Sequence, residues 1–228
     1  IIWIEHYDRV LPELKARMQR ARQERRSPPV DRWIVLGMPP EQGYHKHFMY
    51  NIGIAAARGD IVVICDSDAI FTPRFVAAIA QAFAHNPSIV LHLDQVRNID
   101  QNNYPFKHPP ISALLGEGCI NWREGKTTGL WEVRDPIHAR NYGACMCARR
   151  EDLLSIGGAD EDFNYLGHMC GPYDMTFRLV NAGRREVWHE TEFLYHTWHP
   201  GSDGINNYYG PHDGRGVSSP AMVALLSG

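Results

Sequence analysis

Two aspartates that flank a serine are the residues of this sequence best suited to hold a metal ion. Asp66 and Asp68 follow directly on the apolar run Ile61–Cys65. In extended backbone, residues two apart point to the same side, so both carboxylates can face one ion. Ligands of open parallel sheets bind beyond the carboxyl ends of the strands, and hard oxygen ligands suit Mg²⁺ or Mn²⁺. A helix-capping aspartate beside a turn aspartate explains the same pattern equally well.

The segments around this pair alternate between strands and helices, which predicts an α/β fold with a mostly parallel central sheet flanked by helices. The run 61–65 is apolar throughout, as is typical of a central strand buried on both faces. Residues 101–140 have weak periodicity and predict an irregular, substrate-facing region, and the glycine-rich tail 201–228 predicts a loop or lid. Strands are expected at 1–5, 33–36, 61–65, 89–96, 142–148 and 193–195, and helices at 11–25, 46–58, 72–86, 150–155 and 172–182.

Composition limits the partners. The chain has 228 residues, a hydrophobic fraction of 44% and a net charge of -3, which suits one soluble domain and gives no reason to expect nucleic acid as a partner. The basic run 17–26 is better explained as a solvated helix face, and no apolar stretch approaches the ~20 residues of a membrane span. Five cysteines without a disulfide pattern favour a reduced, cytoplasmic setting, in which Cys145 and Cys147 are core residues. Because residues 1–4 predict a strand already under way, we interpret the chain as part of a longer polypeptide.

Four blocks in order resemble the family 2 glycosyltransferases. The first is Asn51-x-Gly53, then Gly59-Asp60, the apolar strand and Asp66-Ser67-Asp68. The later blocks are Gly157-Gly158-Ala159-Asp160-Glu161, the run from Asp174 through Arg178 to Gly183, and His196. The resemblance implies a single GT-A-like domain over 1–228 that transfers a sugar from a nucleotide-diphospho-sugar to a saccharide or another hydroxyl-bearing acceptor. It also implies a nucleotide-binding part at about 1–100, an acceptor part at about 101–200, and a first nucleotide-binding strand that this chain lacks.

The resemblance and the residue chemistry together assign roles. Asp66, Asp68 and His196 are expected to bind Mn²⁺ or Mg²⁺, and Asp174 is the first choice for the general base, with Glu161 and Asp162 in reserve. Lys46 either supplies a charge for the diphosphate or is a solvated helix lysine. Trp198 is expected to stack on an acceptor sugar. Asp94 either contacts the acceptor or is a polar residue at a strand end. The residues expected to bind the nucleotide-sugar are Glu5, Lys46, Asn51, Ser67 and His199.

Other classes stay open to different degrees. A dehalogenase-like phosphatase would need Thr or Val where Ile70 stands, which makes it a poor fit. A GT-A-fold nucleotidyltransferase is a closer alternative. A catalytically impaired sugar-nucleotide-binding module is another, because Pro172 and Gly171 stand six and seven residues before Arg178, where many relatives carry an acidic pair.

Overall fold

The structure is a computed structural model that describes residues 1–8, 10, 12–39, 41–104, 107–128, 140, 142–162 and 171–198. The helices are α1 (Pro12–Gln23), α2 (Lys46–Ala56), α3 (Phe75–His85), α4 (Ile111–Leu114), α5 (Arg150–Ser155) and α6 (Gly171–Asn181), with a 3₁₀ turn at Gln101–Asn103. The strands are β1 (Ile2–Tyr7), β2 (Arg32–Met38), β3 (Ile61–Cys65), β4 (Ala69–Phe71), β5 (Ile89–His92), β6 (Gln95–Asn98), β7 (Trp122–Arg123), β8 (Lys126–Thr127), β9 (Cys145–Arg149), β10 (Arg185–Trp188) and β11 (Leu194–Thr197).

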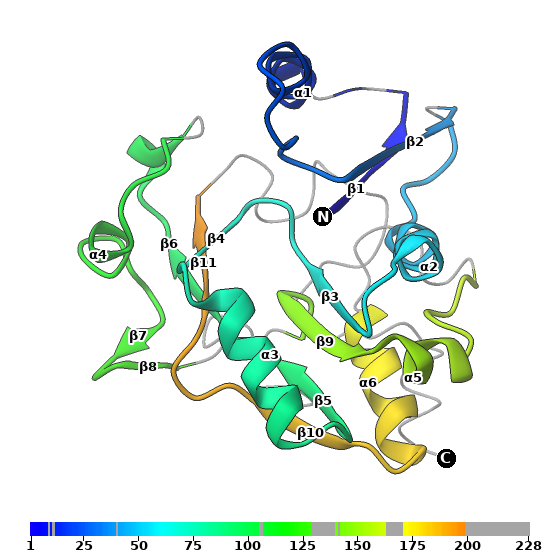
Figure 1. Cartoon of the computed structure of the whole chain (residues 1–228). Helices are drawn as coiled ribbons and strands as arrows, with labels where there is room; N and C mark the ends of the chain where they lie inside the picture. Colours follow the sequence, from blue (N-terminus) through cyan, green and yellow to red (C-terminus); the bar gives the residue numbers. More distant parts are fainter. Residues whose placement is uncertain are drawn as a thin grey trace.

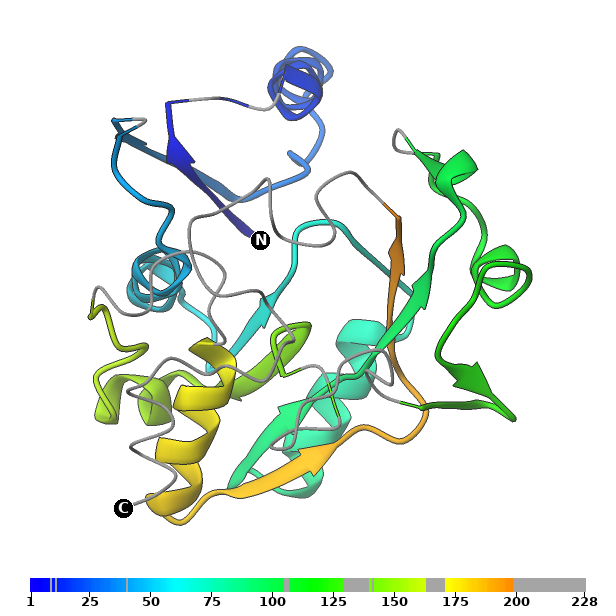
Figure 2. The ribbon, with the colours of Figure 1, turned by 180° about the vertical axis from the view of Figure 1, so that it is seen from behind.

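A four-stranded sheet with the order β10-β5-β9-β3 forms the centre of the molecule (Figure 1). Strand β10 is parallel to β5, and β9 is antiparallel to both β5 and β3, so three of the four strands run in one direction. Helix α3 buries Phe75, Ile79 and Phe83 against one face. Helices α2, α5 and α6 lie on the other side (Figure 2). They bury apolar side chains such as Ile54 and Met175 there. The layered α/β architecture confirms the predicted fold class.

Two details of the sheet differ from expectation. The predicted strand 89–96 is divided between β5 and β6, which lie in different sheets, because the carboxylate of Asp94 accepts the backbone N–H of Gln95 and turns the chain there. Strand β3 is not buried on both faces: Val62 and Ile64 are each 8% exposed, whereas Val63 is 39% exposed. Helix α3 packs over the neighbouring strands, and Val63 belongs to none of the core clusters.

A second sheet, β4-β11-β6, continues from the first and carries the chain back past the end of β3. Strand β11 runs antiparallel to β4 and parallel to β6. Strands β1 and β2 form a separate parallel pair, on which α2 packs so closely that a Cβ on Gly53 would lie 3.3 Å from Ile4 Cδ1.

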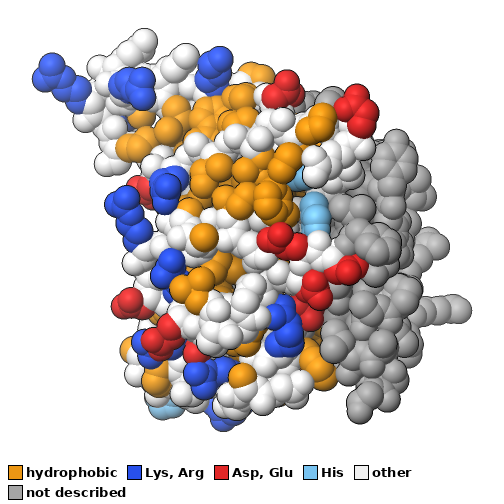
Figure 3. Space-filling model, turned by 90° about the vertical axis from the view of Figure 1, so that its right-hand side faces the viewer, with side chains coloured by type: hydrophobic (Ala, Val, Ile, Leu, Met, Phe, Trp, Pro, Cys, Tyr) orange, Lys and Arg blue, Asp and Glu red, His pale blue; other side chains and the backbone are white. Residues whose placement is uncertain are grey.

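Among the described strands, β1 pairs with β2 and β3 pairs with β9, so each has an edge that no described strand occupies. Figure 3 shows apolar side chains at the surface on the side of the molecule to the right in Figure 1. The expectation of a further nucleotide-binding strand stays a prediction.

Within the described part of the chain, none of the helices has the length and apolar character required to cross a bilayer.

Candidate functional site

The turn from Asp66 to Asp68 joins β3 to β4 and gives its two aspartates different partners. Lys46 donates a hydrogen bond to Asp66, with 2.8 Å between Nζ and Oδ1. His196 Nε2 lies 3.1 Å from Asp68 Oδ2. The backbone turns here, whereas the sequence pattern had suggested an extended conformation, and the shared metal site of the two carboxylates stays a prediction. Ser67, at the tip of the turn, is exposed.

The pairing of β11 with β4 places His196 beside the turn. His196 lies opposite Ala69, the residue after Asp68. The histidine side chain is 10% exposed and that of Asp68 is 40% exposed, so the pair has a fixed nitrogen ligand and an accessible oxygen ligand. Adjacent ligands of an octahedral ion at ~2.1 Å stand ~3 Å apart, which is close to the separation of these two atoms. In the described residues no larger group of His, Cys, Asp and Glu is arranged to hold a metal.

Lys46 is the first residue of α2, and its environment includes the end of β1. Burial raises the pKa of Tyr44, and the charged and polar groups that act on this phenol include Lys46, Asp66 and Glu5. The carboxylate of Glu5 accepts the indole N–H of Trp3 at 2.8 Å. Lys46 and Asp66 are therefore in direct contact, and the charge of Glu5 acts on the neighbouring Tyr44.

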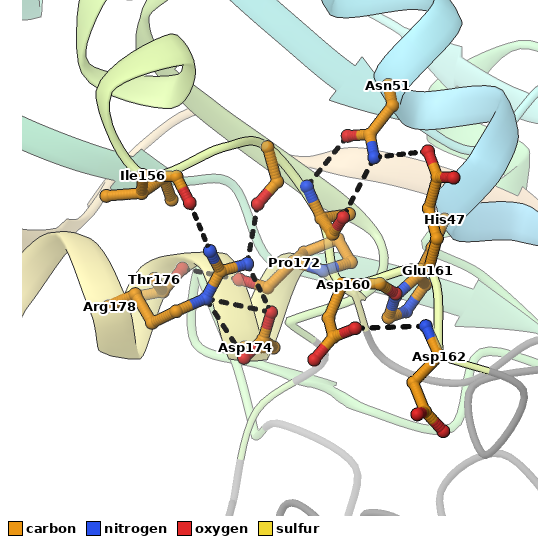
Figure 4. Close-up of polar contacts among 12 residues, drawn as sticks. His47, Asn51, Ile156, Asp160, Glu161, Asp162, Pro172, Asp174, Thr176 and Arg178 are labelled. Atoms are coloured by element: carbon orange, nitrogen blue, oxygen red, sulfur yellow. Dashed lines mark hydrogen bonds and ion pairs between the residues drawn. The ribbon is translucent and has the colours of Figure 1, made fainter.

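Asn51, also expected in the donor site, contacts a different segment. Its amide donates to the carbonyl of Ala159 at 2.8 Å and to a carboxylate oxygen of Glu161 at 2.7 Å, and it accepts the N–H of Ala159 at 2.8 Å. These contacts occupy both ends of the amide and hold an acidic turn that follows Gly157 and Gly158 (Figure 4). Both glycines have positive φ, at 78° and 73°, which permits the turn.

An open cavity of about 470 Å³ lies against this turn, with Asn51, Ala159, Asp160, Glu161, Asp174 and Arg178 among its lining residues. Among the described residues, Asn51 is the one side chain that bonds the Glu161 carboxylate, and Glu161 is exposed. Figure 3 shows acidic side chains along the border with the grey region. The cavity is therefore lined by groups that accept hydrogen bonds from hydroxyls.

Asp174, the first choice for a base, is instead 1% exposed and ion-paired. Arg178 donates to it three times, at 3.2, 3.1 and 2.5 Å, and also donates to the carbonyls of Ile156 at 2.7 Å and Gly158 at 2.5 Å. The carboxylate thus orients an arginine that supports the glycine turn. These contacts favour a structural role for Asp174 over proton transfer.

Two of the remaining predicted residues, Asp94 and Trp198, contact other segments. Asp94 is 3% exposed and accepts the Thr127 hydroxyl at 2.6 Å, which ties β8 to the end of β5. Trp198 is half-buried, with its ring 5.9 Å from that of Tyr104 in an edge arrangement. His199 and the tail 201–228 lie outside the described residues.

Sequence reasoning missed the two histidines on either side of Lys46. His45 Nε2 lies 3.0 Å from the carbonyl oxygen of Glu161, and His47 Nδ1 lies 2.5 Å from that of Asp160. The available signal was the dense run of hydrogen-bonding rings from Tyr44 to His47 at the start of a helix.

Comparisons with known proteins bear on the family to which this chain belongs. The glycosyl transferase family 2 model matches residues 37–157. The O-antigen biosynthesis protein RfbC of Myxococcus xanthus is 29% identical over 150 residues, which cover 64% of this chain and 10% of the relative. The chain therefore spans about a tenth of the length of this curated relative.

Two solved glycosyltransferase structures resemble this chain to different degrees. GalNAc-T7 with UDP, GalNAc and Mn²⁺ superposes with a TM-score of 0.54 at 11% identity, over 87% of this chain and 37% of that one. The mannosyltransferase PcManGT of Pyrobaculum calidifontis, in complex with GDP-Man and Mn²⁺, has a TM-score of 0.43 at 15% identity, over 85% of this chain and 55% of that one.

The likeness to GalNAc-T7 establishes the GT-A fold. The family model covers more than half of the chain and includes α2, the turn from Asp66 to Asp68, and the glycine turn as far as Gly157. The chain belongs to glycosyl transferase family 2.

Proposed function

We propose that this chain forms the catalytic part of a metal-dependent glycosyltransferase that moves a sugar from a nucleotide-diphospho-sugar to a hydroxyl of its acceptor. The observation that carries the proposal is the pair of contacts at the carboxyl end of β3, Lys46 with Asp66 and His196 with Asp68. One cation, two carboxylates and an imidazole at the end of a strand suit a diphosphate and a divalent ion. Family membership supports the same reaction class.

Asp68 and His196 are the residues that would hold Mn²⁺ or Mg²⁺. Their 3.1 Å separation suits adjacent ligands, and the exposure of Asp68 leaves room for phosphate oxygens. An imidazole ligand favours Mn²⁺ over Mg²⁺. Bound there, the ion would stabilise the negative charge of the departing nucleotide diphosphate.

Lys46 provides a positively charged side chain at the carboxyl end of β3, next to the proposed metal site. The Lys46 side chain is 18% exposed and its ammonium lies beside Asp66, so the ammonium is oriented by the carboxylate and the side chain is partly shielded from water. Electrostatic interactions are stronger where water is excluded, which favours a contact between Lys46 and a donor phosphate.

Glu161 is the better candidate for the general base. Its carboxylate lies at the cavity and is oriented by the Asn51 amide, whereas that of Asp174 is engaged by Arg178. The carboxylate would take the proton of an acceptor hydroxyl as that oxygen attacks the anomeric carbon and the bond to the diphosphate breaks. His45 contacts the backbone of Glu161 while the next residue, Lys46, contacts Asp66, so the two halves of the site are adjacent.

Binding measurements test the donor site. Calorimetry with UDP and with GDP, each with and without Mn²⁺, is expected to show metal-dependent binding of one nucleotide. Asp68→Asn and His196→Ala should each weaken this binding by at least ~10-fold. Even the loss of a residue that only hydrogen-bonds to a metal ligand lowers metal affinity by ~10–100-fold. Asp60→Asn, at the amino end of the same strand, is the matched control and should bind like the parent. Equal binding by all four proteins would remove Asp68 and His196 from the site.

Product analysis distinguishes the alternatives. Release of a nucleoside diphosphate from a nucleotide-sugar indicates glycosyl transfer or donor hydrolysis. Release of pyrophosphate from a nucleoside triphosphate and a sugar phosphate indicates a nucleotidyltransferase. Binding without either reaction indicates a catalytically impaired module.

A further inference from the structure

Three side chains, from the residue before α2 and from its first half, contact three consecutive backbone carbonyls of the acidic turn. Asn51 donates to Ala159 at 2.8 Å, His47 reaches Asp160 at 2.5 Å and His45 reaches Glu161 at 3.0 Å. The partners are 108, 113 and 116 residues apart in the chain. Figure 4 shows Asn51 and His47 reaching from the helix to the turn.

His47 is the most buried member of this group, with an exposed fraction of 0%. A carbonyl oxygen can only accept, so Nδ1 of His47 carries the proton in this contact. The ring stacks on Tyr50 with centroids 6.1 Å apart. Gly171 leaves space for it, because a Cβ there would lie 2.7 Å from His47 Nε2. Helix α6 thus begins with a residue small enough to admit the imidazole.

The turn held in this way carries the acids at the cavity. The N–H of Asp162 donates to the Asp160 carboxylate at 2.9 Å, and Asn51 donates to the Glu161 carboxylate at 2.7 Å. The same helix presents Lys46 to Asp66. Helix α2 therefore sets the position of the acidic turn relative to the metal and diphosphate edge.

We propose that His47 is a positioning residue: by holding the carbonyl of Asp160 it aims the carboxylate of Glu161 at the acceptor hydroxyl. The inference rests on the proposed function, in which Glu161 serves the acceptor side. Without the Nδ1–H donor, the carbonyl of Asp160 loses a buried partner and the turn has one fewer tie to α2. A misplacement of ~1 Å in a reacting group costs on the order of 10²-fold in rate.

Two substitutions of His47 test the role of its hydrogen-bond donor, the Nδ1–H group. His47→Leu removes it, whereas the amide nitrogen of His47→Asn occupies nearly the place of Nδ1 and restores it. With a nucleotide-sugar and water or an acceptor, His47→Leu is expected to lower kcat by ~10–100-fold, and His47→Asn to recover most of that loss. Binding of Mn²⁺ and nucleoside diphosphate should be unchanged in both. His85→Leu, at the last residue of α3, is the matched control.

Hydrogen exchange gives a readout that needs no turnover. The amide protons of Ala159 and Asp162 should exchange faster in His47→Leu than in the parent, and at the parental rate in His47→Asn. His45→Ala is a milder second perturbation, to be used if His47→Leu does not fold, and should lower kcat several-fold with faster exchange of the same amides.

The outcomes separate this inference from the proposed function. Parental kcat and exchange in His47→Leu overturn the inference, and so does an equal loss in the Leu and Asn variants, which would indicate packing alone. If the parent itself turns over no nucleotide-sugar, the proposed function fails. The exchange data then still decide whether Nδ1 of His47 holds the turn.

Discussion

Replacing Asp174 by asparagine separates a structural role of this carboxylate from a role in proton transfer. The carboxylate is 1% exposed and is held by Arg178, which also donates to two backbone carbonyls near the glycine turn. Breaking a buried pair by removing one partner costs ~3–5 kcal/mol. Because the Arg178 side chain is 27% exposed and keeps its carbonyl partners, we expect a smaller loss of ~2–3 kcal/mol. For a chain of this size that loss corresponds to ~4–12 °C in Tm.

Urea unfolding followed by circular dichroism measures the free energy of unfolding, and turnover of a nucleotide-sugar is measured on the same preparation. Asp60→Asn serves as the control and should change the unfolding free energy by less than ~0.5 kcal/mol. An Asp174→Asn protein with the parental urea midpoint would refute the structural role. If such a protein also lost ~10²–10⁴-fold in kcat, Asp174 and not Glu161 would be the general base.

Three further predictions concern pH, the glycine turn and the sheet edges. Burial lowers the pKa of His92 from 6.5 to about 4, so its contribution to stability is complete above pH 6.5 and is lost as the pH falls towards 4. We expect His92 to account for a decrease of ~2 kcal/mol in the free energy of unfolding between pH 7 and pH 5. In urea unfolding, this decrease should be absent in His92→Gln and present in His85→Gln. In the same assay, Gly158→Ala should lower the free energy of unfolding by at least ~2 kcal/mol more than Gly157→Ala. Both glycines have positive φ, so both substitutions strain the backbone. Only a Cβ on Gly158 would also clash, because it would lie 2.2 Å from Asn51 Oδ1, whereas one on Gly157 meets nothing within 4 Å. A longer polypeptide that adds a strand at the edge of β1 or β3 should bind the donor nucleotide more tightly than this chain in calorimetry, and equal affinities would count against a missing strand.

Local sequence determined the elements that carry the site. The apolar run of β3 has the length and β-branched content of a strand, and the polar triplet from Asp66 to Asp68 ends it where a parallel sheet binds ligands. Helix α2 follows from its periodicity, and the two glycines at 157 and 158 predict the turn that their positive φ angles form. These features depend on neighbours within a few residues, which the sequence displays directly.

The partner of each polar group was decided by the tertiary structure. Asp68 meets His196, 128 residues away, because β11 pairs with β4 in one register, and Asn51 and His47 meet the acidic turn because α2 packs beside it. The family resemblance pointed to His196, but no local pattern distinguished the exposed carboxylate of Glu161 from the ion-paired one of Asp174. Sheet order, strand register and helix packing depend on the burial of apolar faces that lie far apart in the chain. The periodicity of a single segment does not encode which face it will meet, so the different surroundings of these acids arise only when the chain is folded.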